Sequence, residues 1–193
     1  MKVKKMDQRS RYTRFTVRKA LLALLTKKTI KEITVSELCN TAQITRGTFY
    51  NHFYDVFDVY ESIEQEFIDQ LKDRMENNPS GGFDRNFIYE MIQLVHDNYD
   101  LISILVGDFK DTMLFEKVYA FAREKYVTEF SQKYPNINQQ KINMFFTYIT
   151  NGSIGLLIEW LESGMAKSCT AIADDISGFA DVLYKAYFLD NQS

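Results

Sequence analysis

The feature that most limits what this chain can fold into is its scarcity of residues that interrupt helices. Its 193 residues include only two prolines, Pro79 and Pro135, and eight glycines. Proline ends or kinks a helix and glycine weakens one, so the long stretches between them can stay helical, whereas a β-sheet protein needs many turns. With 46% hydrophobic residues the chain can also bury a sizeable core. We therefore predict an all-α fold.

Apolar residues recur at steps of three and four along most of the chain, which is the spacing of one helix face. Phe15, Ala20, Leu21 and Leu24 mark such a face in the first segment. The run 77–82 breaks the pattern and is the best internal boundary or loop. The pattern predicts about nine helices: 13–27, two short helices within 34–53, then 55 or 58 to 75, 84–97, 100–106, 111–134, 136 or 138 to 163, and 171–189.

The first of the two short helices begins with a capping box. The Thr34 hydroxyl can accept a hydrogen bond from the amide of Glu37, while the Glu37 carboxylate reaches back to Thr34. Ile33 before the cap and Leu38 after it are spaced to pack on each other as a hydrophobic staple. The apolar period is lost soon afterwards, so the helix is short.

The second short helix begins at Thr45, another residue suited to an N-cap. Phe49 and Phe53 share one face at i, i+4 and can anchor the helix to its neighbours. Gly47 weakens the helix by about 1 kcal/mol relative to alanine, yet lets its backbone approach another molecule closely. The remaining residues are polar donors: Thr45, Arg46, Thr48, Tyr50, Asn51 and His52. Two short helices joined by a tight turn predict a helix-turn-helix over 34–53, which puts the second helix in the DNA major groove.

Charge is distributed unevenly along the chain. Residues 1–53 hold 12 Lys and Arg against three acidic residues, a balance of +9, and the remainder holds 11 basic and 23 acidic residues, a balance of −12. The net charge of −3 is therefore the sum of a positively charged head, residues 1–53, and a negatively charged body, residues 54–193. That distribution is typical of a small DNA-reading module on a body that does not touch phosphate.

The segment Thr45-Arg46-Gly47-Thr48-Phe49-Tyr50-Asn51-His52-Phe53 resembles the recognition-helix signature of the TetR/AcrR family of transcriptional regulators. The preceding segment 33–39 resembles the family's second helix, and 13–27 its first. The resemblance covers about residues 8–68. It implies a DNA-binding domain over 8–68, followed over 69–193 by a regulatory and dimerisation domain.

The resemblance also implies which side chains meet DNA. Those expected to contact phosphates are Thr34, Thr45, Tyr50 and His52. Those expected to approach base edges are Arg46, Thr48 and Asn51, with Gly47 allowing close approach. Three alternatives stay open: His52 packed at a helix end, Tyr50 in the core, and Arg46 on phosphate instead of guanine.

Two residues depart from the family pattern. The family usually has glycine where Gln43 stands, so either Gln43 takes a conformation that suits glycine better or the turn differs. The family often has lysine where Val56 stands, so one phosphate contact is expected to be absent here.

The segment from Tyr148 to Met165 is similar to the C-terminal domain of the TetR subgroup that includes regulators resembling the dihydroxyacetone-kinase activator. Two glycines within this predicted helix weaken it, and close approach of another helix is the usual compensation. The resemblance implies a homodimer in which this helix and the last one form a four-helix bundle with their copies. The residues expected at this interface are Gly152, Gly155, Leu156 and Trp160.

An inducer pocket in the body is an open alternative to a plain core. The aromatic residues that would line it are Phe83, Phe87, Tyr89, Tyr99, Phe109, Phe115, Tyr119, Phe121, Tyr126 and Phe130. His96 is a candidate polar contact with a ligand, or a structural histidine. Aromatic residues at helical spacing are more often core.

Other classes of protein find little support. Cys39 and Cys169 fit no metal-ligand spacing, and no phosphate loop, HExxH, CxxC or GxSxG indicates an enzyme, a metal or a cofactor. No stretch is long and apolar enough for a membrane span, so we expect a cytoplasmic protein. The resemblance thus implies a homodimeric repressor that binds a palindromic double-stranded operator and is released by a small-molecule effector. The alternative is a TetR-like regulator or activator that works mainly through a protein partner.

Overall fold

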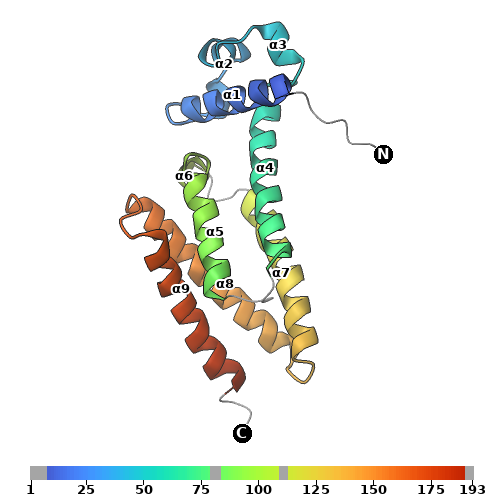
Figure 1. The fold of residues 1–193 in the computed structure, drawn as a ribbon, viewed down its shortest axis with the longest axis vertical. Coiled ribbons are helices and arrows are strands. Elements are labelled where there is room, and N and C mark those ends of the chain that lie inside the picture. Colours follow the sequence, from blue (N-terminus) through green and yellow to red (C-terminus); the bar gives the residue numbers. More distant parts are fainter. Residues whose placement is uncertain (1–7, 79–83, 109–112, 190–193) are drawn as a thin grey trace. The chain divides into compact units, whose positions relative to one another are not determined.

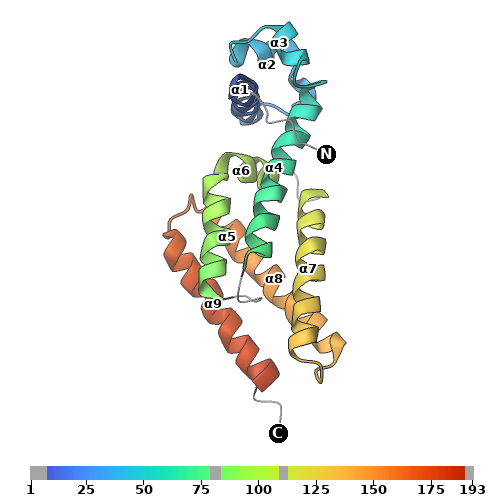
Figure 2. The same ribbon diagram turned by 45° about the vertical axis from the view of Figure 1, so that its right-hand side comes forward.

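The computed structural model describes residues 8–78, 84–108 and 113–189, and the chain divides into two compact units, 1–67 and 68–193. The described residues are helical and contain no strand, which confirms the predicted all-α class (Figures 1 and 2). The helices are α1 (Gln8–Leu25), α2 (Val35–Thr41), α3 (Arg46–Tyr50), α4 (Val56–Glu76), α5 (Arg85–Asp97), α6 (Tyr99–Asp108), α7 (Met113–Lys133), α8 (Gln139–Glu162) and α9 (Cys169–Tyr184), with a 3-10 turn at Ile30–Glu32 and a π-helical turn at Lys185–Leu189. In the described part of the chain, no helix is long and apolar enough to cross a membrane.

Every helix of the first unit contributes a hydrophobic side chain to the interior. Val17 and Leu21 of α1, Leu38 of α2, Phe49 of α3 and Val59 of α4 are all fully buried. Such burial stabilises the folded state by about 1.5–3 kcal/mol for each large side chain. The short helices α2 and α3 therefore owe their stability to this shared interior.

A polar contact also ties α1 to α4 within the first unit. Arg18 Nε donates to Ser62 Oγ at 3.0 Å, and the Arg18 guanidinium forms an ion pair with Glu66. The first helix begins at Gln8, five residues before the predicted start, because its opening turns are polar and carry no apolar period. Phe15 is 62% exposed, so its assignment to the buried face was wrong.

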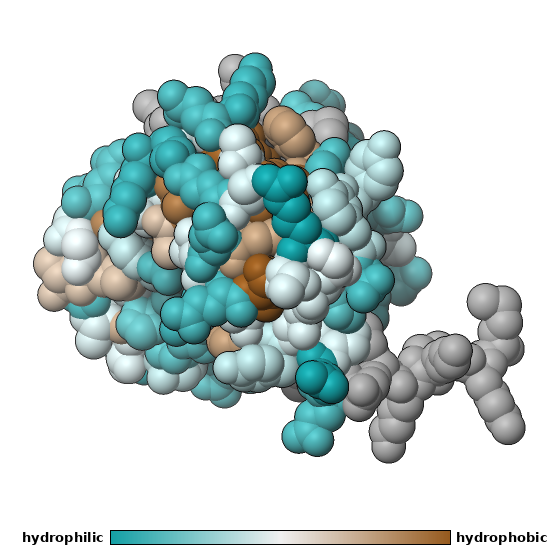
Figure 3. Space-filling view, turned by 90° about the horizontal axis from the view of Figure 1, so that it is seen from above, coloured by the Kyte–Doolittle hydropathy of each residue, from teal (hydrophilic) through white to brown (hydrophobic). Residues whose placement is uncertain are grey.

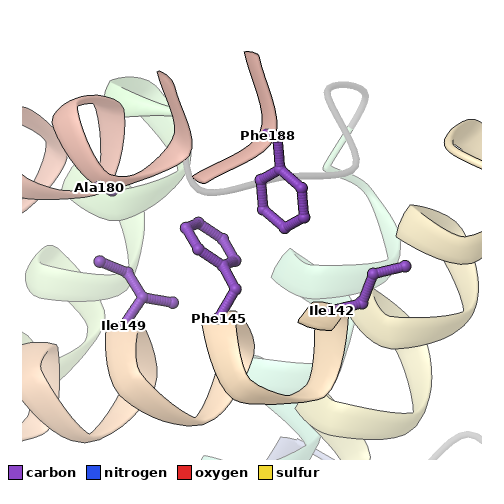
Figure 4. Packing of buried hydrophobic residues seen from close by; sticks show 5 residues of the cluster. All are labelled: Ile142, Phe145, Ile149, Ala180 and Phe188. Carbon is purple, nitrogen blue, oxygen red and sulfur yellow. The ribbon is translucent and has the colours of Figure 1, made fainter. Parts of the chain in front are cut away.

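The second unit is held by two apolar clusters. The first joins Met75 of α4, Phe87 of α5, Tyr126 of α7 and Phe146 of α8. The second, shown in Figure 4, joins three residues of α8 to α9 and to the π-helical turn that follows it; its buried members are Ile142, Phe145, Ile149, Ala180 and Phe188.

Phe188 closes the second cluster. Its ring lies 4.9 Å from that of Phe145, edge to face, and 5.6 Å from that of Tyr184, and only 2% of the residue is exposed. The hydroxyls of Tyr134 and Tyr184 are hydrogen-bonded at the same place, and burial raises the pKa of Tyr184 to about 12. The cluster itself contains no charged side chain that would oppose its packing.

Replacing Phe188 with alanine should lower the free energy of unfolding of the second unit by about 3–5 kcal/mol, because the cavity left behind cannot fully collapse. Urea unfolding followed by the fluorescence of Trp160, the single tryptophan, measures this loss. The neighbouring Leu189 is 49% exposed, so Leu189→Ala is the matched control and should change little. Equal effects of the two substitutions would contradict the anchoring role of Phe188.

Candidate nucleic-acid interface

The N-terminus of α2 is capped as the sequence predicted, but only in part. Thr34 Oγ1 accepts from the Glu37 N–H at 3.2 Å, which confirms the first half of the capping box. The second half is wrong, because the Glu37 carboxylate accepts from Lys28 Nζ at 2.6 Å instead of reaching back to Thr34. Ile33 and Leu38 on either side of the cap are both buried.

The turn between α2 and α3 is a Schellman motif. The Gln43 N–H donates to the Asn40 carbonyl at 3.2 Å, and the Ile44 N–H donates to the Cys39 carbonyl at 3.0 Å. The motif places Gln43 at φ 54°, in the left-handed region that favours glycine. The prediction that Gln43 takes a glycine-like conformation is therefore confirmed, and the turn keeps its geometry despite the substitution.

The helix α3 begins at the second predicted cap. Thr45 Oγ1 accepts from the Thr48 N–H at 3.1 Å, and the two hydroxyls lie 2.9 Å apart. The helix ends at Tyr50 rather than Phe53, since Asn51 already forms its C-cap. His52 and Phe53 continue as a turn, with both of their N–H groups bonded to the Phe49 carbonyl.

One face of this short helix is buried and the other is exposed. Phe49 is fully buried and Phe53 is 3% exposed, with their ring centroids 5.8 Å apart. Tyr50 is 59% exposed, with its ring edge-to-face against that of Phe49, so the alternative that placed it in the core is wrong. The exposed polar residues of this segment are Thr45, Arg46, Tyr50 and Asn51; Gly47 is also exposed, and Thr48 is partly buried.

His52 is held at the end of the motif by two residues of α1. Its Nδ1 lies 3.4 Å from Ser10 Oγ, and its carbonyl accepts from Arg14 Nη2 at 3.3 Å. The Arg14 guanidinium also lies over the Phe53 ring, 5.1 Å from its centroid. His52 is therefore half-buried and packed, while α1 fixes the end of the segment that carries the donors.

The described residues around Gly47 do not require glycine at this position. Among the described residues, a Cβ at this position would meet only Thr45 Oγ1, at an ordinary contact distance of 3.8 Å. Alanine would fit and would strengthen the helix by about 1 kcal/mol. The described residues therefore leave room for a side chain at this position.

The N-terminus of α4 is closed by carboxylates. Asp55 Oδ1 accepts from the Asp58 N–H at 2.9 Å, and Asp58 Oδ2 accepts from the Tyr54 N–H at 2.7 Å. Val56 is 5% exposed and belongs to the interior. Two acidic groups at this helix end repel phosphate, which agrees with the loss of the family's lysine at this position.

The basic residues of the first unit fall into two groups. Arg14 and Arg18 are tied to neighbouring side chains, whereas Arg9, Arg11 and Lys19 are exposed on α1. The face of the first unit seen in Figure 3 is largely hydrophilic, with small hydrophobic patches between polar side chains. A surface of this kind suits a polyanion better than an apolar partner.

The residues expected at a dimer interface lie on α8. Gly152 and Gly155 are exposed, and no atom of the described part of the chain lies within 4 Å of a Cβ built on either. Leu156 is partly buried. Trp160 is only 4% exposed, and its Nε1 donates to the Lys167 carbonyl at 2.8 Å, so its side chain packs inside its own unit.

The aromatic residues of the body are mainly core. Phe87 and Tyr126 are buried, and Tyr119, Phe121 and Phe130 pack against the two clusters. Phe83 and Phe109 lie outside the described residues, as does the side chain of Phe115. Tyr89 and Tyr99 are partly buried.

A cavity of about 460 Å³ lies elsewhere, between α8 and α9. Its walls include Leu156, Trp160, Ile172 and Phe179, together with the charged Glu159, Lys167 and Asp175. His96 does not line it, since its half-exposed ring stacks on Trp160 and its Nδ1 lies 3.3 Å from Asp97 Oδ1. No group of three or more candidate metal ligands was found in the described ranges.

A comparison with known families decides the class of the protein. Residues 85–181, half of the chain, match the TetR_C_8 family, described as a transcriptional regulator C-terminal region. The chain belongs to the TetR family of transcriptional regulators. The family assignment rests on the second unit, and it agrees with the resemblance found in the first.

Solved structures of other TetR-family proteins share the fold. The dihydroxyacetone kinase operon activator DhaS is 19% identical, with a TM-score of 0.64, over 90% of this chain and 97% of that one. A putative TetR-family regulator from Syntrophomonas wolfei is 15% identical, with a TM-score of 0.72, over 94% and 99%. An uncharacterised HTH-type regulator of Bacillus subtilis, YxbF, is 21% identical over 83% of this chain. The chain spans about two-fifths of the length of that curated relative, since 42% of it is covered.

Sequence reasoning missed the contacts that hold this interface from neighbouring helices. Ser36 of α2 accepts a hydrogen bond from Arg46 Nη2, and Ser10 and Arg14 of α1 hold His52. Burial raises the pKa of the Cys39 thiol, an effect that the charge of Arg46 partly offsets. The spacing of these residues along the chain carries no signal of such contacts.

Replacing Gln43 with glycine should raise the free energy of unfolding of the first unit by roughly 0.5–1 kcal/mol. Glycine removes the cost of about 1–2 kcal/mol of holding a residue with a Cβ in the left-handed region. It also raises the entropy of the unfolded chain, which offsets part of that gain. Gln43→Ala keeps a Cβ at the same φ and is the matched control. Urea unfolding followed by circular dichroism compares the two. A glycine variant no more stable than the alanine variant would show that the turn is unstrained.

Proposed function

We propose that this TetR-family regulator binds double-stranded DNA through α2 and α3, as a homodimer on a palindromic operator. The observation that carries the proposal is the division of α3 into two faces. Phe49 is buried and fixes the helix, while the opposite face presents donors around Gly47, where the described residues leave room for a side chain. A recognition helix needs both properties, because it must be held rigidly and yet approach the base edges.

The proposed roles are those that the family resemblance implies. Thr34, Thr45, Tyr50 and His52 are assigned to phosphates, and Arg46, Thr48 and Asn51 to base edges. Exposure of Tyr50, Arg46 and Asn51 supports these roles. The packed His52 suits an anchor at the end of the motif, because a fixed ring can offer one donor without reordering.

The proposed homodimer rests on an exposed apolar stripe in the second unit. Its residues lie on α8 and α9 on the outside of the single chain: Met144, Tyr148, Gly152, Gly155, Phe179 and Val182. Small residues let two helices approach closely, and the large ones supply apolar area to bury. Two copies of α3 brought about 34–36 Å apart can read half-sites one helical turn apart.

Repression with release by a small effector is the regulatory proposal, since ligands commonly act on such regulators by shifting a conformational equilibrium. The cavity between α8 and α9 is a candidate site for an effector, and it adjoins the proposed stripe through Phe179. Activation through a protein partner is the second candidate. Its support is the similar fold of DhaS, which is named as an operon activator. A reporter assay with and without the protein separates repression from activation.

The DNA proposal is tested with a duplex selected by the protein from a randomised pool, against a shuffled duplex of equal composition. The selected duplex should bind more tightly, and its affinity should fall by about 10³-fold between 50 and 200 mM salt if about six phosphates are contacted. Gly47→Ala should weaken this binding while raising the free energy of unfolding by about 0.5–1 kcal/mol. Absence of binding to every duplex, in fluorescence anisotropy, would refute the proposal.

The dimer is tested by sedimentation of Gly155→Glu. The substitution fills open space in the single chain, so the protomer should fold, whereas a buried charge at the stripe should shift a dimer to monomer at micromolar concentration. Thr128→Glu on the exposed side of α7 is the matched control and should leave the dimer intact. A monomeric wild-type protein would rule out the assembly.

A further inference from the structure

Arg46 is held by a residue of the other helix of the motif. Its Nη2 donates a hydrogen bond to Ser36 Oγ. Ser36 is the second residue of α2 and Arg46 is the first residue of α3, so the bond joins the first turns of the two helices. The two residues are ten positions apart in the sequence.

The partner of Arg46 is neutral, unlike that of Arg18. Arg18 forms an ion pair with Glu66, which would have to be broken before Arg18 could serve an anion. The carboxylate nearest to Ser36 along the chain, Glu37, accepts from Lys28 at 2.6 Å. The hydroxyl of Ser36 therefore orients the guanidinium without cancelling its charge, and Arg46 keeps its attraction for DNA.

Orientation matters for one of the two roles open to Arg46. Reading guanine requires two parallel N–H groups aimed at O6 and N7, and guanidinium offers five donors in a fixed plane. One of these five N–H donors binds Ser36, so four remain for a base. Contact with phosphate depends on charge and tolerates many directions, so it gains little from a fixed plane.

We propose that Ser36 is a positioning residue that aligns the Arg46 guanidinium for a guanine edge in the operator. The inference rests on the proposed DNA-binding function and adds the residue that gives Arg46 its sequence preference. A free arginine loses side-chain entropy when it is fixed on a base. The hydrogen bond to Ser36 restricts the Arg46 side chain before DNA binds, so less side-chain entropy is lost on binding. This gain in affinity should appear mainly in the specific complex, because only a base contact requires the guanidinium plane to be fixed.

The test uses the duplex selected from a randomised pool by the wild-type protein and its shuffled counterpart. Ser36→Ala should raise Kd for the selected duplex about 3- to 10-fold, the size of a typical net hydrogen-bond contribution, and change Kd for the shuffled duplex by less than about twofold. Ser36→Thr, which keeps a hydroxyl, should restore the preference. Ser62→Ala removes the hydroxyl that accepts from Arg18 and is the matched control, expected to leave the preference unchanged.

The double variant decides whether Ser36 acts through Arg46. In an Arg46→Ala background, Ser36→Ala should have no further effect on either duplex. Equal weakening of both duplexes, or an undiminished effect without Arg46, would overturn the positioning role while leaving DNA binding in place. Circular dichroism melting of each variant separates these outcomes from unfolding, which would affect both duplexes. A wild-type protein that selects no duplex overturns the proposed function itself, and the positioning role with it.

Discussion

Burial of Phe49 is the interaction on which the short helix α3 and the turn after it depend. A helix of five residues cannot persist alone, because nucleating a helix costs more than so few hydrogen bonds return. Phe49 is fully buried, and its carbonyl also accepts the N–H groups of His52 and Phe53. One side chain and one carbonyl thus hold the helix, its exit turn and the donors on its outer face.

Local features of this region could be predicted from the sequence. The caps at Thr34 and Thr45 depend on residues three positions apart, and the left-handed Gln43 follows from a family pattern in which glycine stands there. The reciprocal contact of Glu37 could not be predicted, because Lys28 competes for the same carboxylate from outside the helix. Interactions between residues close in the sequence therefore predicted where α2 and α3 begin, but not which partners their charged side chains bind.

Contacts between segments escaped prediction for the same reason. Nothing in the period of α1 distinguishes the exposed Phe15 from the buried Leu21, because both are apolar and only the packing of other helices decides between them. Nothing in the spacing of the chain indicated that the indole N–H of Trp160 donates to the Lys167 carbonyl inside its own unit. The fold class, set by composition and period, was predictable, whereas the identity of each contact surface needed the assembled helices.

The helical glycines at 47, 152 and 155 make the unbound protomer less stable than the same fold would be with alanine at these positions. Each forgoes about 1 kcal/mol that alanine would provide, out of a total that is typically about 5–15 kcal/mol. Whatever binds the folded chain at these positions restores stability by mass action. Copies with nothing bound at these positions should therefore unfold more often than bound copies.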